Sequence, residues 1–143
     1  MRRLSLLSIL LLLAACADVP SRYGTFVPIN PATRQALAVD AADQLARVFP
    51  PALNRFNLQA PILADGFAPA LTRELQQRGY AVAQPTSISG TSPAPGTTLG
   101  YVITAQGDAL ICLTLYLGPQ TLSRAYVLGN GTTYAAGAWT RKE

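Results

Sequence analysis

Apolar residues recur at helical spacing in the stretch NPATRQALAVDAADQLARVFPP, which covers residues 30–51. Leu37, Ala41, Leu45 and Val48 follow one another at intervals of four, four and three residues. This spacing places them in one stripe along a helix, while most of the charged residues lie off the stripe. The pattern therefore predicts an amphipathic helix that buries one side.

Both ends of this segment carry signals that delimit a helix. Asn30 is a favoured N-cap residue, and Pro31 suits the first helical turn, where no backbone donor is needed. Pro50 and Pro51 end the helix, because proline lacks a donor and restricts the residue before it. We expect a helix over residues 31–49.

A short strand is predicted next, in the stretch NRFNLQA. Phe56, Leu58 and Ala60 alternate with the polar residues between them, which is typical of a half-buried strand.

A second helix and a strand are predicted in DGFAPALTRELQQRGYAV, residues 65–82. The first residue of this stretch, an aspartate, can cap the helix. Phe67, Leu71 and Leu75 share one face, and Gly79 stands where a left-handed C-cap is expected. Strand, helix and strand then form one crossover unit, which is right-handed if its strands are parallel neighbours.

The stretch PTSISGTSPAPGTT, residues 85–98, has the composition of a flexible loop. Strand patterns separated by turn signals follow it, and such spacing predicts an antiparallel meander. The four strand segments read GYVITAQ, ALICLTLYL, TLSRAYVL and TTYAAGAWTR. ALICLTLYL is apolar on both faces, so we expect it near the centre of the sheet. Trp139, in the last segment, is either a core residue, which we favour, or an edge aromatic for a partner.

These elements predict one domain of the α+β class over residues 31–143. Two helices pack on a mixed, mainly antiparallel sheet that ends in a four-strand meander. The loop at residues 85–98 lies inside this domain, because the part that follows it is too small to fold well alone.

The start of the chain has the layout of a bacterial lipoprotein signal. Arg2 and Arg3 precede an apolar run over residues 4–15, which as a helix spans about 18 Å, short of the roughly 30 Å of a bilayer core. The run ends in Leu-Ala-Ala-Cys, which resembles the lipobox, where a diacylglycerol is joined to a cysteine thiol before cleavage. We expect residues 1–15 to be a signal peptide and Cys16 to be the lipid attachment site. The alternative is a plain signal peptide with a chance cysteine.

Residues 16–30 would then be the lipidated N-terminus and a tether, since they carry two prolines, a glycine and no helical period. Tyr23 and Phe26 are aromatic residues within this tether. They are either docking points for a partner or residues that pack back on the domain, and the sequence leaves both open.

The net charge of the chain bears on whether nucleic acid is a partner. The chain has 11 Lys and Arg against 7 Asp and Glu, and loss of Arg2 and Arg3 with the signal leaves a net charge of about +2. After the predicted signal, only Arg141 and Lys142 are adjacent basic residues. Nucleic-acid binding needs a basic face, so this class is disfavoured.

Once Cys16 is acylated, Cys112 has no partner within the chain, so no intramolecular disulfide is expected. Its place in ALICLTLYL predicts a small buried apolar residue. An intermolecular disulfide or a reactive thiol is the functional alternative, although no basic neighbour in sequence lowers its pKa.

The chain contains no histidine, which removes the commonest general base and most zinc sites. Asp40 and Asp43 are three residues apart on the first predicted helix, and a solvated helix face explains them. The glycine turns show no phosphate-binding pattern. We therefore expect no catalytic residues, no cofactor and no metal. A structural part of an envelope assembly and a lipoprotein that carries a small apolar ligand remain.

Several segments together resemble one family, the TrbH lipoproteins of conjugative transfer systems. They are the lipobox at Cys16, YGTFV, DAADQLARVFPPALNRFNLQ, DGFAPALTRELQQRGYAV, LTLYLGPQTLSRAY and the terminal AGAWTRKE. They cover most of the mature chain in the order of the family, with the same Pro/Ser/Ala-rich interruption.

The resemblance implies a component of the type IV secretion channel that assembles for mating-pair formation, with channel proteins as partners and no small-molecule substrate. It supplies no catalytic residues, and only Cys16 carries over as a defined site. Asp18 follows the cysteine one place too late for an inner-membrane retention signal, so we expect an outer-membrane anchor that faces the periplasm.

Overall fold

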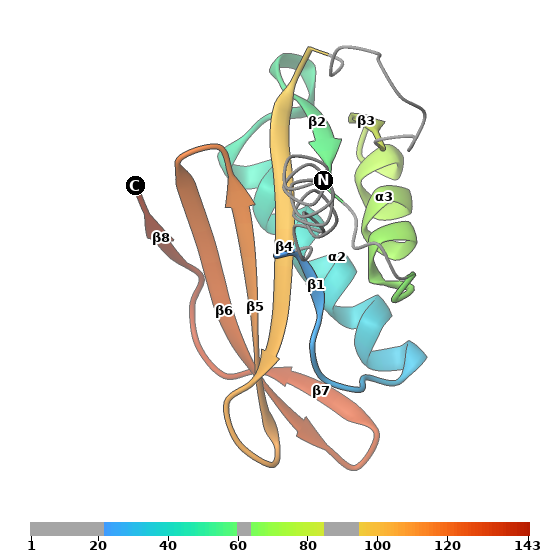
Figure 1. Cartoon of the computed structure of the whole chain (residues 1–143), viewed down its shortest axis with the longest axis vertical. Helices are drawn as coiled ribbons and strands as arrows, with labels where there is room; N and C mark the ends of the chain where they lie inside the picture. The colour runs from blue at the N-terminus through green and yellow to red at the C-terminus, as the bar shows by residue number, and fades with distance from the viewer. Residues whose placement is uncertain (1–21, 60–63, 85–94) are drawn as a thin grey trace, which may run out of the picture.

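The computed structural model describes residues 22–59, 64–84 and 95–143. It contains one mixed β-sheet, with helices α2 (Pro31–Val48) and α3 (Phe67–Gln77) together on one side of it (Figure 1). The strands are β1 (Gly24–Thr25), β2 (Arg55–Leu58), β3 (Ala81–Ala83), β4 (Thr97–Ala105), β5 (Leu110–Leu117), β6 (Gln120–Gly129), β7 (Thr132–Ala135) and β8 (Thr140–Lys142), and a 3-10 turn, η1, spans Pro51–Leu53.

The strand order is β3-β2-β4-β5-β6-β7, while β1 pairs with β4 and β8 pairs with β6. Strands β1, β2 and β3 join the sheet by parallel pairing, and the pairs from β4 onward are antiparallel. The predicted fold class is therefore confirmed: two helices pack on a mixed, mainly antiparallel sheet that ends in a meander. Strand β5 lies between β4 and β6, as its apolar sequence predicted.

Local signals place the ends of both helices. The Asn30 side-chain oxygen accepts a hydrogen bond from the Thr33 N–H at 2.7 Å, so α2 begins where its cap was predicted. Helix α3 begins at Phe67, because Gly66 adopts a left-handed conformation (φ +75°) in front of it. Gly79, at φ +90°, follows the helix as predicted.

The core lies between the helices and the sheet. Strand β5 shows the strict alternation of a sheet covered on one side, with every second residue from Ile111 to Leu117 buried. We call this covered side the inner face and the opposite side the outer face. The largest fully buried side chains are Tyr101, Phe56, Phe67, Leu37, Leu45, Leu58, Leu71, Leu75, Leu99, Ile103, Ile111 and Leu113.

Two boundaries differ from the sequence prediction because pairing with distant strands sets them. The loop predicted to end at residue 98 ends earlier, since Thr97 and Thr98 pair with Phe56 and Asn57 of β2. The last predicted strand is divided into β7 and β8, which pair with different parts of β6. Trp139 lies in the break, where it is partly buried and packs against the core.

Cys112 is not the fully buried residue that its apolar neighbours predicted. It lies on the outer face of β5 and is only partly buried, because both helices cover the inner face. Its thiol lies near the Thr114 hydroxyl, 3.9 Å away. The alternation along β5 separates Cys112 from the buried residues on either side of it.

Candidate docking site at the N-terminal strand

The segment after Arg22 is partly built into the sheet. Gly24 and Thr25 pair in parallel with Val102 and Ile103 of β4. The Phe26 N–H then donates to the Ile103 carbonyl oxygen at 2.8 Å. The tether predicted for residues 16–30 is therefore shorter at its C-terminal end, because β1 is a strand of the domain.

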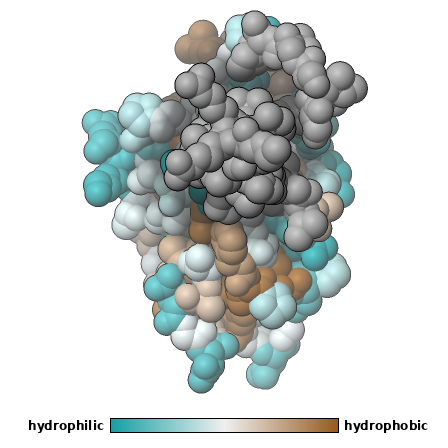
Figure 2. Space-filling model, viewed as in Figure 1, coloured by the Kyte–Doolittle hydropathy of each residue, from teal (hydrophilic) through white to brown (hydrophobic). Residues whose placement is uncertain are grey.

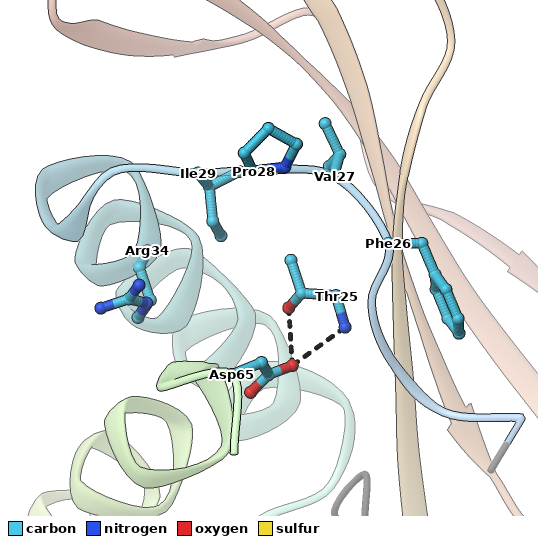
Figure 3. Close-up of a pocket in the computed structure, with 7 residues that line it drawn as sticks. All are labelled: Thr25, Phe26, Val27, Pro28, Ile29, Arg34 and Asp65. Atoms are coloured by element: carbon cyan, nitrogen blue, oxygen red, sulfur yellow. Dashed lines mark hydrogen bonds between the residues drawn. The ribbon is translucent and has the colours of Figure 1, made fainter. Parts of the chain in front are cut away.

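Asp65 fastens β1 to the rest of the fold. Its Oδ2 atom accepts hydrogen bonds from the Thr25 N–H at 2.9 Å and from the Thr25 hydroxyl at 2.7 Å (Figure 3). The Tyr101 hydroxyl also donates to this carboxylate at 2.8 Å, and the Phe67 N–H donates to Oδ1 at 3.0 Å. The cap position predicted for Asp65 is occupied by Gly66, but the Asp65 carboxylate still accepts the first N–H of α3 and at the same time holds β1.

The phenol of Tyr101 is held in its neutral form. Burial and the hydrogen bond to Asp65 raise the pKa of the Tyr101 hydroxyl far above its ordinary value. The neutral hydroxyl remains a donor, which the Asp65 carboxylate requires. Tyr101 therefore serves as a hydrogen-bond donor that helps to hold the Asp65 carboxylate in place.

A hollow of ≈ 450 Å³ lies beside this clamp, between residues 25–29, Arg34 and Asp65 (Figure 3). The Arg34 guanidinium lies against Gly66, where a Cβ would meet it at 2.9 Å. Its Nε atom is buried and has no hydrogen-bond partner among the residues that the structure describes. The hollow is open to solvent and combines apolar side chains with both charges, so it is a surface feature rather than an enclosed apolar cavity.

The two aromatic residues predicted as docking points have different environments. The Tyr23 ring lies 5.6 Å from the Tyr116 ring, centroid to centroid, and occupies the space over Gly100 that a Cβ would fill. Phe26, in contrast, is 61% exposed. Tyr23 therefore packs back on the domain, which was one of the two alternatives. Phe26 is exposed, as a docking point for a partner would have to be.

Asp40 belongs to a contact that the sequence did not reveal. Its carboxylate accepts from Arg124 Nη1 at 2.9 Å, from the Tyr126 hydroxyl at 2.6 Å and from Trp139 Nε1 at 3.2 Å. Burial and the hydrogen bond to Asp40 raise the pKa of Tyr126 well above its ordinary value. The interpretation of Asp40 as part of a solvated helix face is therefore wrong, because Asp40 joins α2 to β6 and to Trp139.

Asp43 also has a partner, although it is more exposed. Its Oδ1 accepts from Arg78 Nη2 at 2.7 Å, and the same guanidinium donates from Nη1 to Glu74 at 2.8 Å. The hydrogen bond from Arg78 lowers the pKa of the Glu74 carboxyl against the opposing effect of burial. This ion-pair group joins α2 to α3.

These carboxylates are distributed over structural contacts. In the ranges 22–59, 64–84 and 95–143, no group of three or more Cys, Asp or Glu could hold a metal ion. None of the helices in those ranges combines the length and apolar character needed to cross a membrane. Cys16, the predicted lipid attachment site, lies outside the described residues.

Comparison with known proteins adds one finding. The family model for "Conjugal transfer protein TrbH" matches residues 20–143 of this chain. No curated protein and no solved structure matches it. The match includes both helices and every strand of the described fold.

Proposed function

The chain belongs to the TrbH family of conjugal transfer proteins, and we propose that it is a lipid-anchored structural component of the type IV secretion apparatus that forms mating pairs. The match over residues 20–143 carries the proposal, because it covers every residue that the structure describes. Other channel proteins are the proposed partners, and plasmid transfer is the process that requires the protein.

Cys16 is the proposed anchor. It follows Leu-Ala-Ala at the end of a short apolar run, which is the arrangement that lipid attachment and cleavage require. A single acyl chain binds a membrane only marginally, whereas a fully processed lipoprotein carries three chains and should not detach. We place the anchor in the outer membrane on the periplasmic side, because Asp18 is one residue too late for the inner-membrane signal.

A structural role fits the chemistry of the domain. The carboxylates of Asp40, Asp65 and Glu74 each accept a hydrogen bond from a residue of another part of the fold, which for Glu74 is Gln35 of α2. The sequence has no histidine to act as a general base. The hollow next to Arg34 is open and charged, which fits an apolar cargo poorly, so we favour an assembly component over a ligand carrier.

Deletion of the gene tests this proposal. We expect plasmid transfer frequency to fall while growth of the host is unchanged, and the wild-type gene supplied in trans should restore transfer. Cys16→Ser should not restore it at normal expression, since the unanchored domain loses the high local concentration that tethering gives. Cys112→Ser is the matched control, because it removes the other cysteine and should restore transfer.

Two further measurements separate the alternatives. The intact mass of the membrane form should show acyl chains on the wild-type protein and none on Cys16→Ser. Pull-down from membranes in mild detergent should recover channel proteins. Wild-type transfer by the deletion strain, together with a bound lipid in the purified protein, would replace this proposal with the carrier function.

A further inference from the structure

The outer face of the sheet differs from the helical side in its charge. On β4, β5 and β6 the outward positions alternate from Thr98 to Thr104, from Leu110 to Tyr116 and from Thr121 to Val127, and none of them is charged. Figure 2 shows hydrophobic residues gathered below the part drawn in grey, on the side turned to the viewer, with hydrophilic residues at the margins of the molecule.

Apolar side chains cluster toward one end of this face. Leu110 pairs with Val127, and Val127 pairs with Tyr134 of β7, so the three form a row across the strands. Val127 is 40% exposed and Tyr134 is 58% exposed. Phe26 lies on the same outer side. The hydroxyl of its neighbour Thr25 faces Asp65 on the helical side, and the Phe26 side chain points the opposite way (Figure 3).

The chain enters the fold across this same face. The Tyr23 ring packs over Gly100 and against Tyr116, which are both outward positions. From Cys16 to Tyr23 the chain has seven residue steps, which reach at most about 25 Å when fully extended. A lipid on Cys16 would therefore hold this side of the domain close to the membrane surface.

None of the acidic residues that the structure describes lies on β4, β5 or β6. Asp40, Asp43, Asp65 and Glu74 are on the helices or directly before α3, while Asp108 lies in the turn between β4 and β5 and Glu143 follows β8. Basic residues also border this sheet, with Arg22 next to Tyr23 and Lys142 on β8. An anionic lipid surface would thus meet no acidic side chain on these strands when it approaches the outer face.

From these observations we propose that the outer face lies on the bilayer to which Cys16 is anchored, with Phe26, Val127 and Tyr134 at the level of the lipid headgroups. This inference rests on the lipid anchor of the proposed function. A tyrosine such as Tyr134 is favoured at that depth, because its ring meets apolar groups and its hydroxyl meets hydrated groups, while Phe26 and Val127 add apolar surface. A weak contact suffices, since the anchor already gives the face a high local concentration at the membrane.

Site-specific labelling tests this orientation in the full lipidated chain. In a Cys112→Ala background, Val127→Cys places a thiol on the outer face, and Arg73→Cys places one on α3, where the native side chain is 58% exposed. The proteins are reconstituted into vesicles of phosphatidylethanolamine and phosphatidylglycerol, and each thiol carries a fluorophore. We expect lipid-borne spin labels to quench the probe at residue 127 at least about threefold more than the probe at residue 73.

Different results would contradict the lipid anchor and the orientation of the domain on the membrane. Protein that shows no acyl mass and does not float with the vesicles would contradict the anchor, and the inference would fall with it. Floating protein in which the two probes are quenched equally would overturn the inference alone. Shielding of residue 127 that appears without lipid quenching, and that disappears when the protein is diluted among the vesicles, would show that a second copy covers the face.

Discussion

Asp40 offers the sharpest test of how this fold is held together. We consider Asp40→Ala in the unlipidated chain from residue 16 that carries Cys16→Ser. The substitution removes the acceptor of three donors, from Arg124, Tyr126 and Trp139. Tyr126 is only 3% exposed, so its hydroxyl would lose its partner in a place that water reaches poorly.

The magnitude follows from these burials. A buried donor left without a partner costs about 1–3 kcal/mol, and the Tyr126 hydroxyl meets that condition. Trp139 is partly buried and adds less, while Arg124 keeps its hydrogen bond from Nε to the Gly137 carbonyl oxygen. We expect a total loss of about 2–4 kcal/mol in the free energy of unfolding. With a urea dependence of about 2 kcal/mol/M, the midpoint should fall by roughly 1–2 M.

Asp43→Ala is the matched control, because it changes the same residue type one turn along α2. The Asp43 side chain is 48% exposed, and Arg78 keeps Glu74 as a partner. We expect a loss of less than about 1 kcal/mol. Urea unfolding followed by circular dichroism compares the two variants. Equal midpoints, or an Asp40→Ala midpoint within error of the parent, would refute the view that Asp40 joins α2 to β6 and to Trp139.

Three further predictions concern other parts of the chain. Cys112→Ala should lower the free energy of unfolding by less than about 1 kcal/mol, since the thiol is only partly buried; a larger loss in urea unfolding would contradict this. Limited proteolysis of the folded protein should cut first within residues 85–96, because of their Pro, Ser, Thr and Gly content; mass spectrometry of the fragments locates the cut, and a first cut within 99–141 would contradict the domain organisation. Because Arg78 lowers the pKa of Glu74 below its ordinary 4.5, this carboxylate stabilises the fold above that pH and the effect is lost as the pH falls through the lowered value. Unfolding measured between pH 7 and pH 3 should show a weaker acid dependence for Glu74→Gln than for the parent, and identical profiles would contradict this role.

Much of the fold could be predicted because its signals are local. The Asn30 cap, Gly79 after α3 and the alternation along β2 each depend on a few neighbouring residues. The turn between β6 and β7 is of the same kind, since Asn130 and Gly131 both adopt positive φ. The start of β4 at Thr97 depends instead on pairing with β2 across the intervening helix, so composition alone placed it in a loop.

The contacts of the site were harder to predict, because their partners are far apart in sequence. Asp40 and Asp43 look alike in the sequence, yet the donors to Asp40 lie 84 to 99 residues away. One feature of the sequence could have indicated the packing of Tyr23. Gly100 interrupts an otherwise apolar strand, and glycine inside a strand often marks the close approach of another group. That signal does not identify which aromatic residue approaches, so the alternatives for Tyr23 and Phe26 could not be separated.

The place of β1 in the sheet changes what an anchor at Cys16 can do. A tether that ran free to residue 30 would let the domain reach up to about 50 Å from its lipid, whereas pairing from Gly24 onward limits this to about 28 Å. If Cys16 carries the proposed lipid, a channel protein would then have to meet the domain close to the membrane. Asp65 holds β1 through two hydrogen bonds from Thr25, so this carboxylate on the helical side helps to set the reach of the anchor. Alternation along this extended segment places Phe26 on the opposite side from Thr25, where 61% of it is exposed, so a proposed anchor at Cys16 would hold this aromatic residue near the membrane as well.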